Sequence, residues 1–196
     1  MPTKTYTSLV LVLSLLFLIG FSSYTSEDYT VRKYLGTKKC KKCHKFEKQG
    51  KQFQIWAESI HALAYETLQS EEADKICKEM GYGDKATESE ECLRCHASGW
   101  EVDEEMLGPK FKIEDGVQCE TCHGAGGDYT KLKIMKNYEV AKEKGLIDLK
   151  DNVEEFCRSC HNPDSPTFAG FNFEEMWAKI EHPLPFRHKD KSAGEK

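Results

Sequence analysis

The chain has 196 residues, of which 31% are charged, and its net charge is −5. After position 26, only 29 of 170 residues are Leu, Ile, Val or Phe; this is about 17%, below the roughly 20% at which a charged chain is suspected of disorder. So polar a chain needs another source of apolar surface or cross-links in order to fold. The composition excludes a multi-span membrane protein, and the acidic charge argues against a nucleic-acid binder.

Residues 1–26 have the pattern of an export signal. Lys4 precedes an apolar run over residues 9–21, and small polar residues follow. A charged start, a short apolar stretch and a small-residue site are typical of a signal peptide. The alternative is an uncleaved N-terminal anchor, although a bilayer span needs about 20 apolar residues. In either case we expect the rest of the chain to be exported to a periplasmic or extracytoplasmic location, with a membrane tether if the signal is kept.

Two helices are predicted directly after the first cysteine-rich segment. Apolar residues recur at three- and four-residue steps from Phe53 to Thr67, which predicts an amphipathic helix within residues 45–69. Ser70 is followed by acidic residues, so a second helix is expected over residues 70–80.

Two more helices are predicted further along the chain. The first covers residues 137–145 and stops at Gly145. The second covers residues 172–181, begins at Asn172 and ends before Pro183. The remaining segments are predicted to be irregular: a polar loop over 81–91, a turn or short hairpin over 101–115, and a polar, disordered tail over 187–196. The fold class is therefore mainly α with extensive loops.

Eight of the nine cysteines fall in four copies of one pattern, Cys-x-x-Cys-His. The copies are Cys40-Lys41-Lys42-Cys43-His44, Cys92-Leu93-Arg94-Cys95-His96, Cys119-Glu120-Thr121-Cys122-His123 and Cys157-Arg158-Ser159-Cys160-His161. The chance expectation for a single copy is roughly 0.01, and the pattern is the attachment sequence of c-type haem. Two thiols three residues apart can bind the two vinyl groups of one porphyrin, and the adjacent histidine can bind the iron from one face.

The motifs therefore predict a multihaem cytochrome c built around four covalently bound haem c groups, within a domain over residues 27–186. Haem also supplies the apolar surface that the composition lacks. Two other interpretations of the cysteines explain less. Paired cysteines can bind zinc, but a zinc ribbon does not require a histidine after every second cysteine. Exported cysteines can form disulfides, but that leaves the four histidines unexplained.

The histidine count limits the ligands of the iron atoms. The motif histidines are predicted to supply one axial ligand each: His44, His96, His123 and His161. Three histidines remain for four open faces: His61, His182 and His188. At least one haem therefore lacks a second histidine from its own chain.

The remaining candidates differ in their sequence settings. His61 lies in a predicted helix and His182 directly precedes a proline, so both are predicted to be axial ligands. His188 lies in the polar tail, where a solvated histidine is the competing interpretation. Met135 is a candidate soft ligand, against a packing role. The ninth cysteine, Cys77, is predicted to be a small buried side chain.

The arrangement of these motifs resembles the tetrahaem cytochrome c-554 family. The likeness spans residues 34–182, and these segments carry it: Tyr34-Leu35-Gly36, Trp56 with Ser59-Ile60-His61-Ala62, the third motif from Gly116 to Gly124, the fourth motif, and Phe173-Glu174-Glu175-Met176 with His182. The resemblance implies a mainly helical fold with haems in close-packed pairs.

The resemblance also implies a set of ligands. His61 would ligate the third haem and His182 the fourth, while the second haem, on His96, would be five-coordinate. The distal histidine of the first haem would stand about ten residues beyond the third motif, where this chain has Lys133. Met135, His188 or a partner protein would then be candidates for that face.

A chain of close haems predicts an electron carrier outside the cytoplasmic membrane, with redox partner proteins as donor and acceptor. One alternative is an enzyme that reduces a small nitrogen compound at an open haem. The sequence has no acid/base cluster beside any motif, so no catalytic residue is assigned. The other alternative is a subunit of a multihaem complex, in which a neighbour supplies the missing histidine.

Overall fold

The computed structural model describes residues 32–183. The chain divides after Val31, and all four Cys-x-x-Cys-His motifs belong to the unit that begins at Arg32. The predicted signal segment, the tail over 187–196 and His188 lie outside the described residues.

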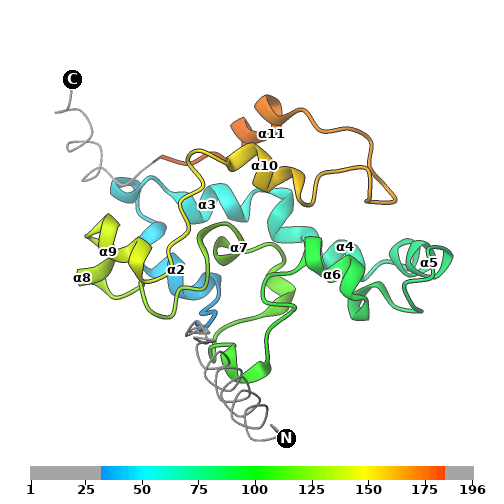
Figure 1. Cartoon of the computed structure of the whole chain (residues 1–196), viewed down its shortest axis with the longest axis horizontal. Coiled ribbons are helices and arrows are strands. Elements are labelled where there is room, and N and C mark those ends of the chain that lie inside the picture. Colours follow the sequence, from blue (N-terminus) through cyan, green and yellow to red (C-terminus); the bar gives the residue numbers. More distant parts are fainter. Residues whose placement is uncertain (1–31, 184–196) are drawn as a thin grey trace, which may run out of the picture. The chain divides into compact units, whose positions relative to one another are not determined.

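The described chain is built from short helices and long connections (Figure 1). The α-helices are α2 (Thr37–His44), α3 (Gln52–Ala57), α4 (Ala64–Leu68), α5 (Glu71–Glu79), α6 (Glu90–His96), α7 (Cys119–His123), α8 (Leu132–Met135), α9 (Tyr138–Glu143), α10 (Val153–Arg158) and α11 (Phe173–Ile180). Short 3-10 turns cover Glu47–Gln49, Ile60–Leu63, Ala86–Glu88, Glu104–Met106 and Ile113–Asp115. The predicted class, mainly α with extensive loops, is confirmed.

The helix predicted within residues 45–69 is wrong as a single element. The segment is divided into a 3-10 turn, α3, a second 3-10 turn and α4. Ser59 is extended (φ −88°, ψ 159°), and its hydroxyl donates to the Trp56 carbonyl at 2.7 Å. This local hydrogen bond ends α3, because a serine side chain can compete with the helical ladder. As a result His61 lies in a 3-10 turn between two short helices.

The helices with polar residues before their first turn agree with the prediction. The Ser70 side chain accepts a hydrogen bond from Ala73 N at 3.2 Å and begins α5. The Asn172 side chain accepts one from Glu175 N at 3.3 Å and begins α11. Such caps satisfy N–H groups that have no partner inside the helix.

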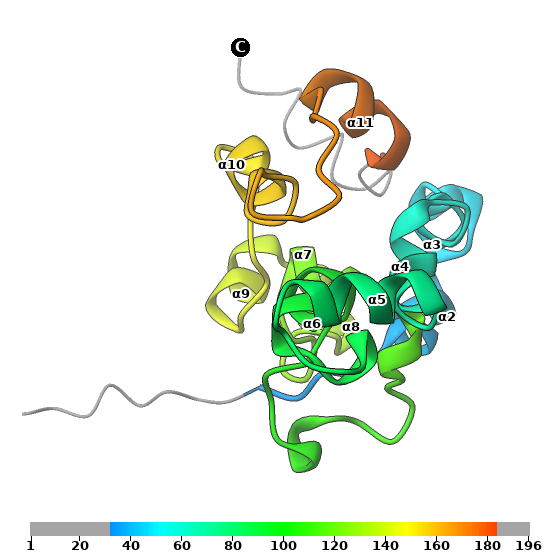
Figure 2. The same cartoon turned by 90° about the vertical axis from the view of Figure 1, so that its right-hand side faces the viewer.

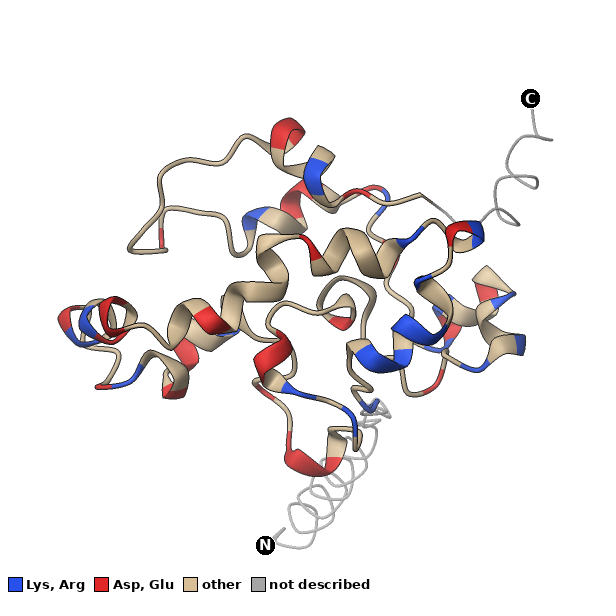
Figure 3. Cartoon of the chain, turned by 180° about the vertical axis from the view of Figure 1, so that it is seen from behind, with Lys and Arg blue, Asp and Glu red and all other residues tan. Residues whose placement is uncertain are grey.

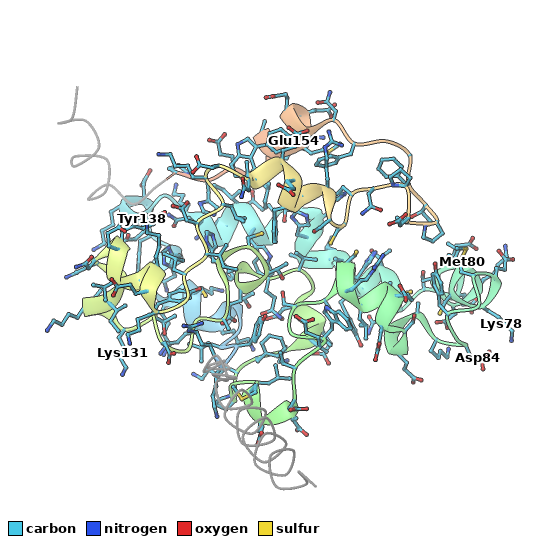
Figure 4. The ribbon with its side chains drawn as sticks, viewed as in Figure 1. Lys78, Met80, Asp84, Lys131, Tyr138 and Glu154 are labelled. Carbon is cyan, nitrogen blue, oxygen red and sulfur yellow. The ribbon has the colours of Figure 1, made fainter. Side chains whose placement is uncertain are left out.

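The segment over 101–115 forms two 3-10 turns instead of a hairpin. One of its contacts with the rest of the fold is an isolated parallel bridge between Tyr34 and Leu107, and the Asp115 carboxylate accepts a hydrogen bond from the Thr37 hydroxyl at 2.6 Å. The predicted polar loop over 81–91 contains a 3-10 turn and the start of α6. Figure 2 shows α4, α5 and α6 side by side, and Lys78 and Asp84 form an ion pair of 3.2 Å at the end of α5 (Figure 4).

The apolar core of the described residues is small. Its buried apolar side chains are Leu68, Cys77, Ala86, Ala97, Tyr129 and Ala141. Cys77 is fully buried against Leu68 and Ala86, as expected for a packing role. Six such residues bury too little apolar surface to stabilise a unit of this length. The haem groups implied by the motifs would supply the apolar surface that a larger core would otherwise provide. Within residues 32–183, no helix is long and apolar enough to cross a bilayer.

Candidate haem sites

Three of the four motifs lie at the ends of short helices. α2, α6 and α7 each end at the motif histidine, His44, His96 and His123. In the fourth motif α10 ends at Arg158, so its second cysteine and His161 lie in the following turn. Cysteines three residues apart lie on one face of a helix, which suits two thioether bonds to the same porphyrin.

The structure brings the cysteines of different motifs together in pairs. The Cys40 thiol interacts with that of Cys119, and this interaction, with burial, raises the pKa of Cys40. The Cys95 thiol interacts in the same way with that of Cys160, which together with burial raises the pKa of Cys95. The first motif therefore adjoins the third, and the second adjoins the fourth. Porphyrins attached at such positions would pack in pairs, as the resemblance implies.

All nine cysteines lie in the described residues, and none is in a disulfide there. In the same part of the chain, no group of three or more Cys, His, Asp or Glu is arranged to hold a metal ion.

Two pairs of histidine rings from distant parts of the chain lie close together, at interplanar angles of 56° and 39°. The ring centres of His61 and His161 are 6.0 Å apart, and those of His123 and His182 are 5.8 Å apart. Two imidazoles that bind one metal ion from opposite sides, each through a ring nitrogen about 2 Å from the metal, have their ring centres roughly 6 Å apart. Both pairs therefore have the spacing that a haem iron would require.

The pairing differs from the one implied by the family resemblance. His61 lies against the histidine of the fourth motif, and His182 lies against the histidine of the third. The assignment implied by the resemblance, with His61 on the third haem and His182 on the fourth, stays a prediction, whereas the structure places His61 beside the fourth motif and His182 beside the third. The physical reason is that α11 packs on α3 and carries the end of the chain toward the third motif.

Burial keeps these imidazoles in the neutral form, which binds iron. Burial, followed by the nearby His182 and His44, lowers the pKa of His123 to about 4. Burial and then His161 lower the pKa of His61. Burial also lowers the pKa of His182, although the carbonyls of His182 and Pro183 oppose this shift.

The histidines of the first two motifs are oriented through their Nδ1 atoms. His96 Nδ1 lies 2.8 Å from the Ala64 carbonyl oxygen, which makes this nitrogen the donor. His44 Nδ1 lies 3.3 Å from the side-chain oxygen of Gln52. A hydrogen bond at one ring nitrogen fixes the tautomer and leaves the other nitrogen to bind the metal.

Because His61 lies against the fourth motif and His182 against the third, no described histidine outside the motifs is left for the far faces of the first and second. Met135 is half-buried at the end of α8, and its ligand role stays a prediction.

His61 is held by the segment that precedes the third motif. Its carbonyl accepts a hydrogen bond from Val117 N at 3.0 Å, and the Val117 carbonyl accepts one from Trp56 Nε1 at 2.7 Å. Gly116 passes so close that an added Cβ would lie 2.6 Å from the His61 carbonyl oxygen. Trp56 and Gly116 are thus positioning residues for the candidate ligand.

His182 is held by the contact between α11 and α3. Gln52 Nε2 donates to the Pro183 carbonyl at 2.9 Å, directly after His182. The His182 Nδ1 atom is buried and has no well-formed hydrogen bond among the described residues. A histidine whose ring is buried in this way suits an iron ligand better than a solvated side chain.

Sequence reasoning missed the residue that joins the first and third motifs. The Glu120 side chain is 2% exposed and lies between the two cysteines of the third motif. Its carboxylate accepts hydrogen bonds from Leu35 N (2.8 and 2.9 Å), Gly36 N (2.7 Å) and Gly126 N (2.7 Å). The x positions of an attachment motif do not contact iron, so the pattern by itself carries no signal for this role.

Gln118 strengthens the same connection. Its side chain is buried, accepts a hydrogen bond from Thr37 N at 3.3 Å, and donates to the Lys112 carbonyl at 2.7 Å. Its backbone N–H donates to the Ser98 hydroxyl at 2.7 Å. The third motif is thereby bound both to the first motif and to the segment that follows the second.

The chain is similar in sequence to known cytochromes. The model of the family "Cytochrome c554 and c-prime" matches residues 39–124. The chain is 32% identical to cytochrome c-554 of Nitrosomonas europaea over 139 residues, which are 64% of this chain and 56% of that protein. It is also 32% identical to the multihaem cytochrome MtrA of Shewanella baltica over 97 residues, which are 46% of this chain and 28% of that protein.

The chain thus covers about half the length of one of these relatives and about a quarter of the other. No solved structure gives a significant match. The repeated attachment motifs and the helical fold agree with these matches: the chain is a multihaem c-type cytochrome that is similar, over residues 39–124, to the cytochrome c-554 family.

Proposed function

We propose that the protein is an exported electron carrier with four haem c groups, one on each Cys-x-x-Cys-His motif. The observation that carries this proposal is the pair of ring separations, 6.0 Å for His61 with His161 and 5.8 Å for His123 with His182. Two histidines on opposite faces of an iron favour electron transfer, because they leave no coordination position for a substrate. The predicted signal over residues 1–26 supports a location outside the cytoplasmic membrane.

The haem groups would supply one-electron chemistry at iron, and the chain sets its conditions. The motif cysteines would hold the cofactors covalently, so that a small core suffices to retain them. The buried histidines stay neutral and present a ring nitrogen to the metal. The bond from His96 Nδ1 to the Ala64 carbonyl raises the basicity of the other ring nitrogen. The thiol contacts between motifs support short distances between the cofactors.

The histidine shortage concerns the first and second motifs. We infer that the far side of the second haem, on His96, is open to small ligands. The far side of the first haem, on His44, would be closed by Met135, by His188 or by a partner chain. An open face would bind carbon monoxide or nitric oxide, but turnover also requires proton delivery beside the iron. A redox partner protein therefore remains the favoured source and acceptor of electrons.

Haem content gives the first test. The chain is produced in a host with haem maturation, and its mass and iron content are measured. Four covalent haems per chain are expected, and three in a Cys157→Ala/Cys160→Ala variant. Cys77→Ala is the matched control, since this buried cysteine belongs to no motif, and it should keep all four. Zinc without iron would refute the proposal.

Turnover separates a carrier from an enzyme. The fully reduced monomer is mixed in a stopped flow with nitrite, hydroxylamine or nitric oxide, and haem oxidation is followed. Slow oxidation is expected with each compound, together with fast oxidation by a protein electron acceptor. Rapid oxidation over many turnovers with one of the nitrogen compounds would instead establish a reductase. A native size above that of a monomer would favour a subunit of a larger complex.

A further inference from the structure

Charge is distributed very unevenly along this acidic chain. Residues 32–51 contain nine Lys or Arg and one Glu, a net charge of +8. Residues 52–115 contain 16 acidic and six basic residues, a net charge of −10. The positive segment includes the first attachment motif, whereas the negative segment includes the second. Such a separation makes association strongly dependent on which face a charged partner approaches.

The positive charge forms an exposed surface on α2 and the turn after it, which we call the basic face. It consists of Lys38, Lys39, Lys41, Lys42, Lys45 and Lys48, all of which are exposed. Figure 3 shows the lysines along α2 in blue. Among the described residues, none of these six lysines forms an ion pair. Glu47, in the turn after α2, pairs instead with Lys51.

An exposed aromatic side chain lies within the basic face. The Phe46 side chain is 46% exposed. The ammonium groups of Lys45 and Lys48 lie 5.1 and 5.9 Å from the centre of its ring. An apolar centre with a charged rim is the composition of a protein-docking surface, since aromatic residues are enriched at the centre of interfaces and polar residues at the rim.

The basic face also adjoins a redox site. Lys41 and Lys42 lie between the two cysteines of the first motif, and the Cys43 side chain is exposed. A porphyrin bound to that sulfur would reach the surface close to Phe46, so an electron could pass there over a short distance.

We propose that the basic face is the docking surface for an acidic redox protein, which exchanges one electron with the haem on Cys40 and Cys43. The inference rests on the carrier function proposed above and adds the entry site and the charge of the partner. In the forward step a reduced acidic protein loses one electron, and the ferric iron at this motif becomes ferrous. The complementary patch on the partner would carry carboxylates around its own cofactor.

A protein suits this surface better than a membrane or a polyanion. The chain as a whole is negative, so extended anionic surfaces are repelled outside the basic face. A protein with a local acidic patch can contact the six lysines and Phe46 without approaching the acidic segment. Salt at physiological strength screens interactions between charges more than about 8 Å apart. The rate of association therefore depends on the charges that come close together at the basic face.

The test uses flavodoxin in its fully reduced form as an acidic one-electron donor to the ferric holoprotein. The variant is Lys38→Gln/Lys45→Gln/Lys48→Gln, which leaves the attachment motif intact. The matched control is Lys75→Gln/Lys78→Gln/Lys179→Gln, which changes the net charge equally at residues of α5 and α11 (Lys78 is labelled in Figure 4). The second-order rate of haem reduction is measured from low to high salt.

At low salt we expect the wild-type rate to fall by about tenfold in the variant and by no more than about twofold in the control. The difference should vanish at high salt, because screening removes the steering. Hexaammineruthenium(II), a small cationic donor, should reduce the variant at least as fast as the wild type.

Three outcomes overturn this inference and leave the carrier function intact. The first is an equal rate in variant and control. The second is salt-dependent self-association that Lys38→Gln/Lys45→Gln/Lys48→Gln abolishes, since a second copy would then occupy the face. The third is binding to phosphatidylglycerol vesicles that is lost in the same variant while its flavodoxin rate is unchanged. A holoprotein that accepts electrons from neither donor would refute the carrier function itself.

Discussion

The buried carboxylate of Glu120 provides the sharpest test of how the fold is held together. The change is Glu120→Gln, which keeps the size of the side chain and leaves the Cys-x-x-Cys-His pattern intact. In the structure the two carboxylate oxygens accept hydrogen bonds from the backbone N–H groups of Leu35, Gly36 and Gly126. An amide has only one oxygen, so its NH₂ group would face at least one of these donors.

The cost follows from the number of donors that lose their acceptor. A buried donor without a partner costs about 1–3 kcal/mol. With one or two donors affected and no solvent contact at a side chain that is 2% exposed, the free energy of unfolding should fall by about 2–4 kcal/mol. For a small protein with a urea dependence of about 2 kcal/mol per M, the unfolding midpoint should fall by roughly 1–2 M.

The assay is urea unfolding of the ferric holoprotein, followed by Soret absorbance and circular dichroism. Mass spectrometry is used to compare the number of haems in each variant. A loss of stability can then be distinguished from incomplete haem attachment. Glu114→Gln is the control, because Glu114 is exposed and precedes the same motif. If the midpoints of the two variants agree within about 0.3 M, Glu120 does not bind the first motif to the third and the reasoning fails.

Three further predictions concern single sites. His61→Gly should convert one haem to high spin without loss of covalent haem, which electron paramagnetic resonance detects; an unchanged spectrum would remove His61 as a ligand. Gly116→Ala should lower the free energy of unfolding, measured by thermal denaturation, by about 1 kcal/mol or more beyond the loss in Gly81→Ala. Both glycines have positive φ, but an added Cβ at 116 meets a backbone oxygen at 2.6 Å and one at 81 meets nothing within 4 Å; equal losses would contradict the clash. The Lys85 side chain lowers the pKa of Asp74 below its usual 3.8, so this stabilisation is full above about pH 4 and is lost as pH falls. Between pH 5 and 3 the melting temperature should therefore fall further in the wild type than in Asp74→Asn, and parallel curves would refute the linkage.

Local features of the fold could be predicted from the sequence because they depend on neighbouring residues. Ser70 and Asn172 begin helices through hydrogen bonds to N–H groups three residues away. The attachment motifs likewise need only the spacing of two thiols and a histidine. Prediction from local pattern failed within residues 45–69. The apolar periodicity of a helix is present there, but the Ser59 hydroxyl donates to the Trp56 carbonyl and the helix ends.

The histidine count also came from the sequence. Seven histidines cannot fill eight axial positions, whatever the fold. The same count, however, cannot say which histidine faces which motif. Nor does the family resemblance decide it, because the structure places His61 beside the fourth motif and His182 beside the third, whereas the resemblance implies the opposite order.

Only the tertiary structure decided how the motifs meet. His61 and His161 are 100 positions apart in the chain, and their ring centres come to 6.0 Å because Val117 and Trp56 hold the first of them in place. Glu120 acts over a similar span, from the third motif to the backbone before the first. Such contacts depend on the simultaneous packing of several distant segments, and no local pattern encodes them, since each partner would be an ordinary polar or glycine residue if the others were elsewhere.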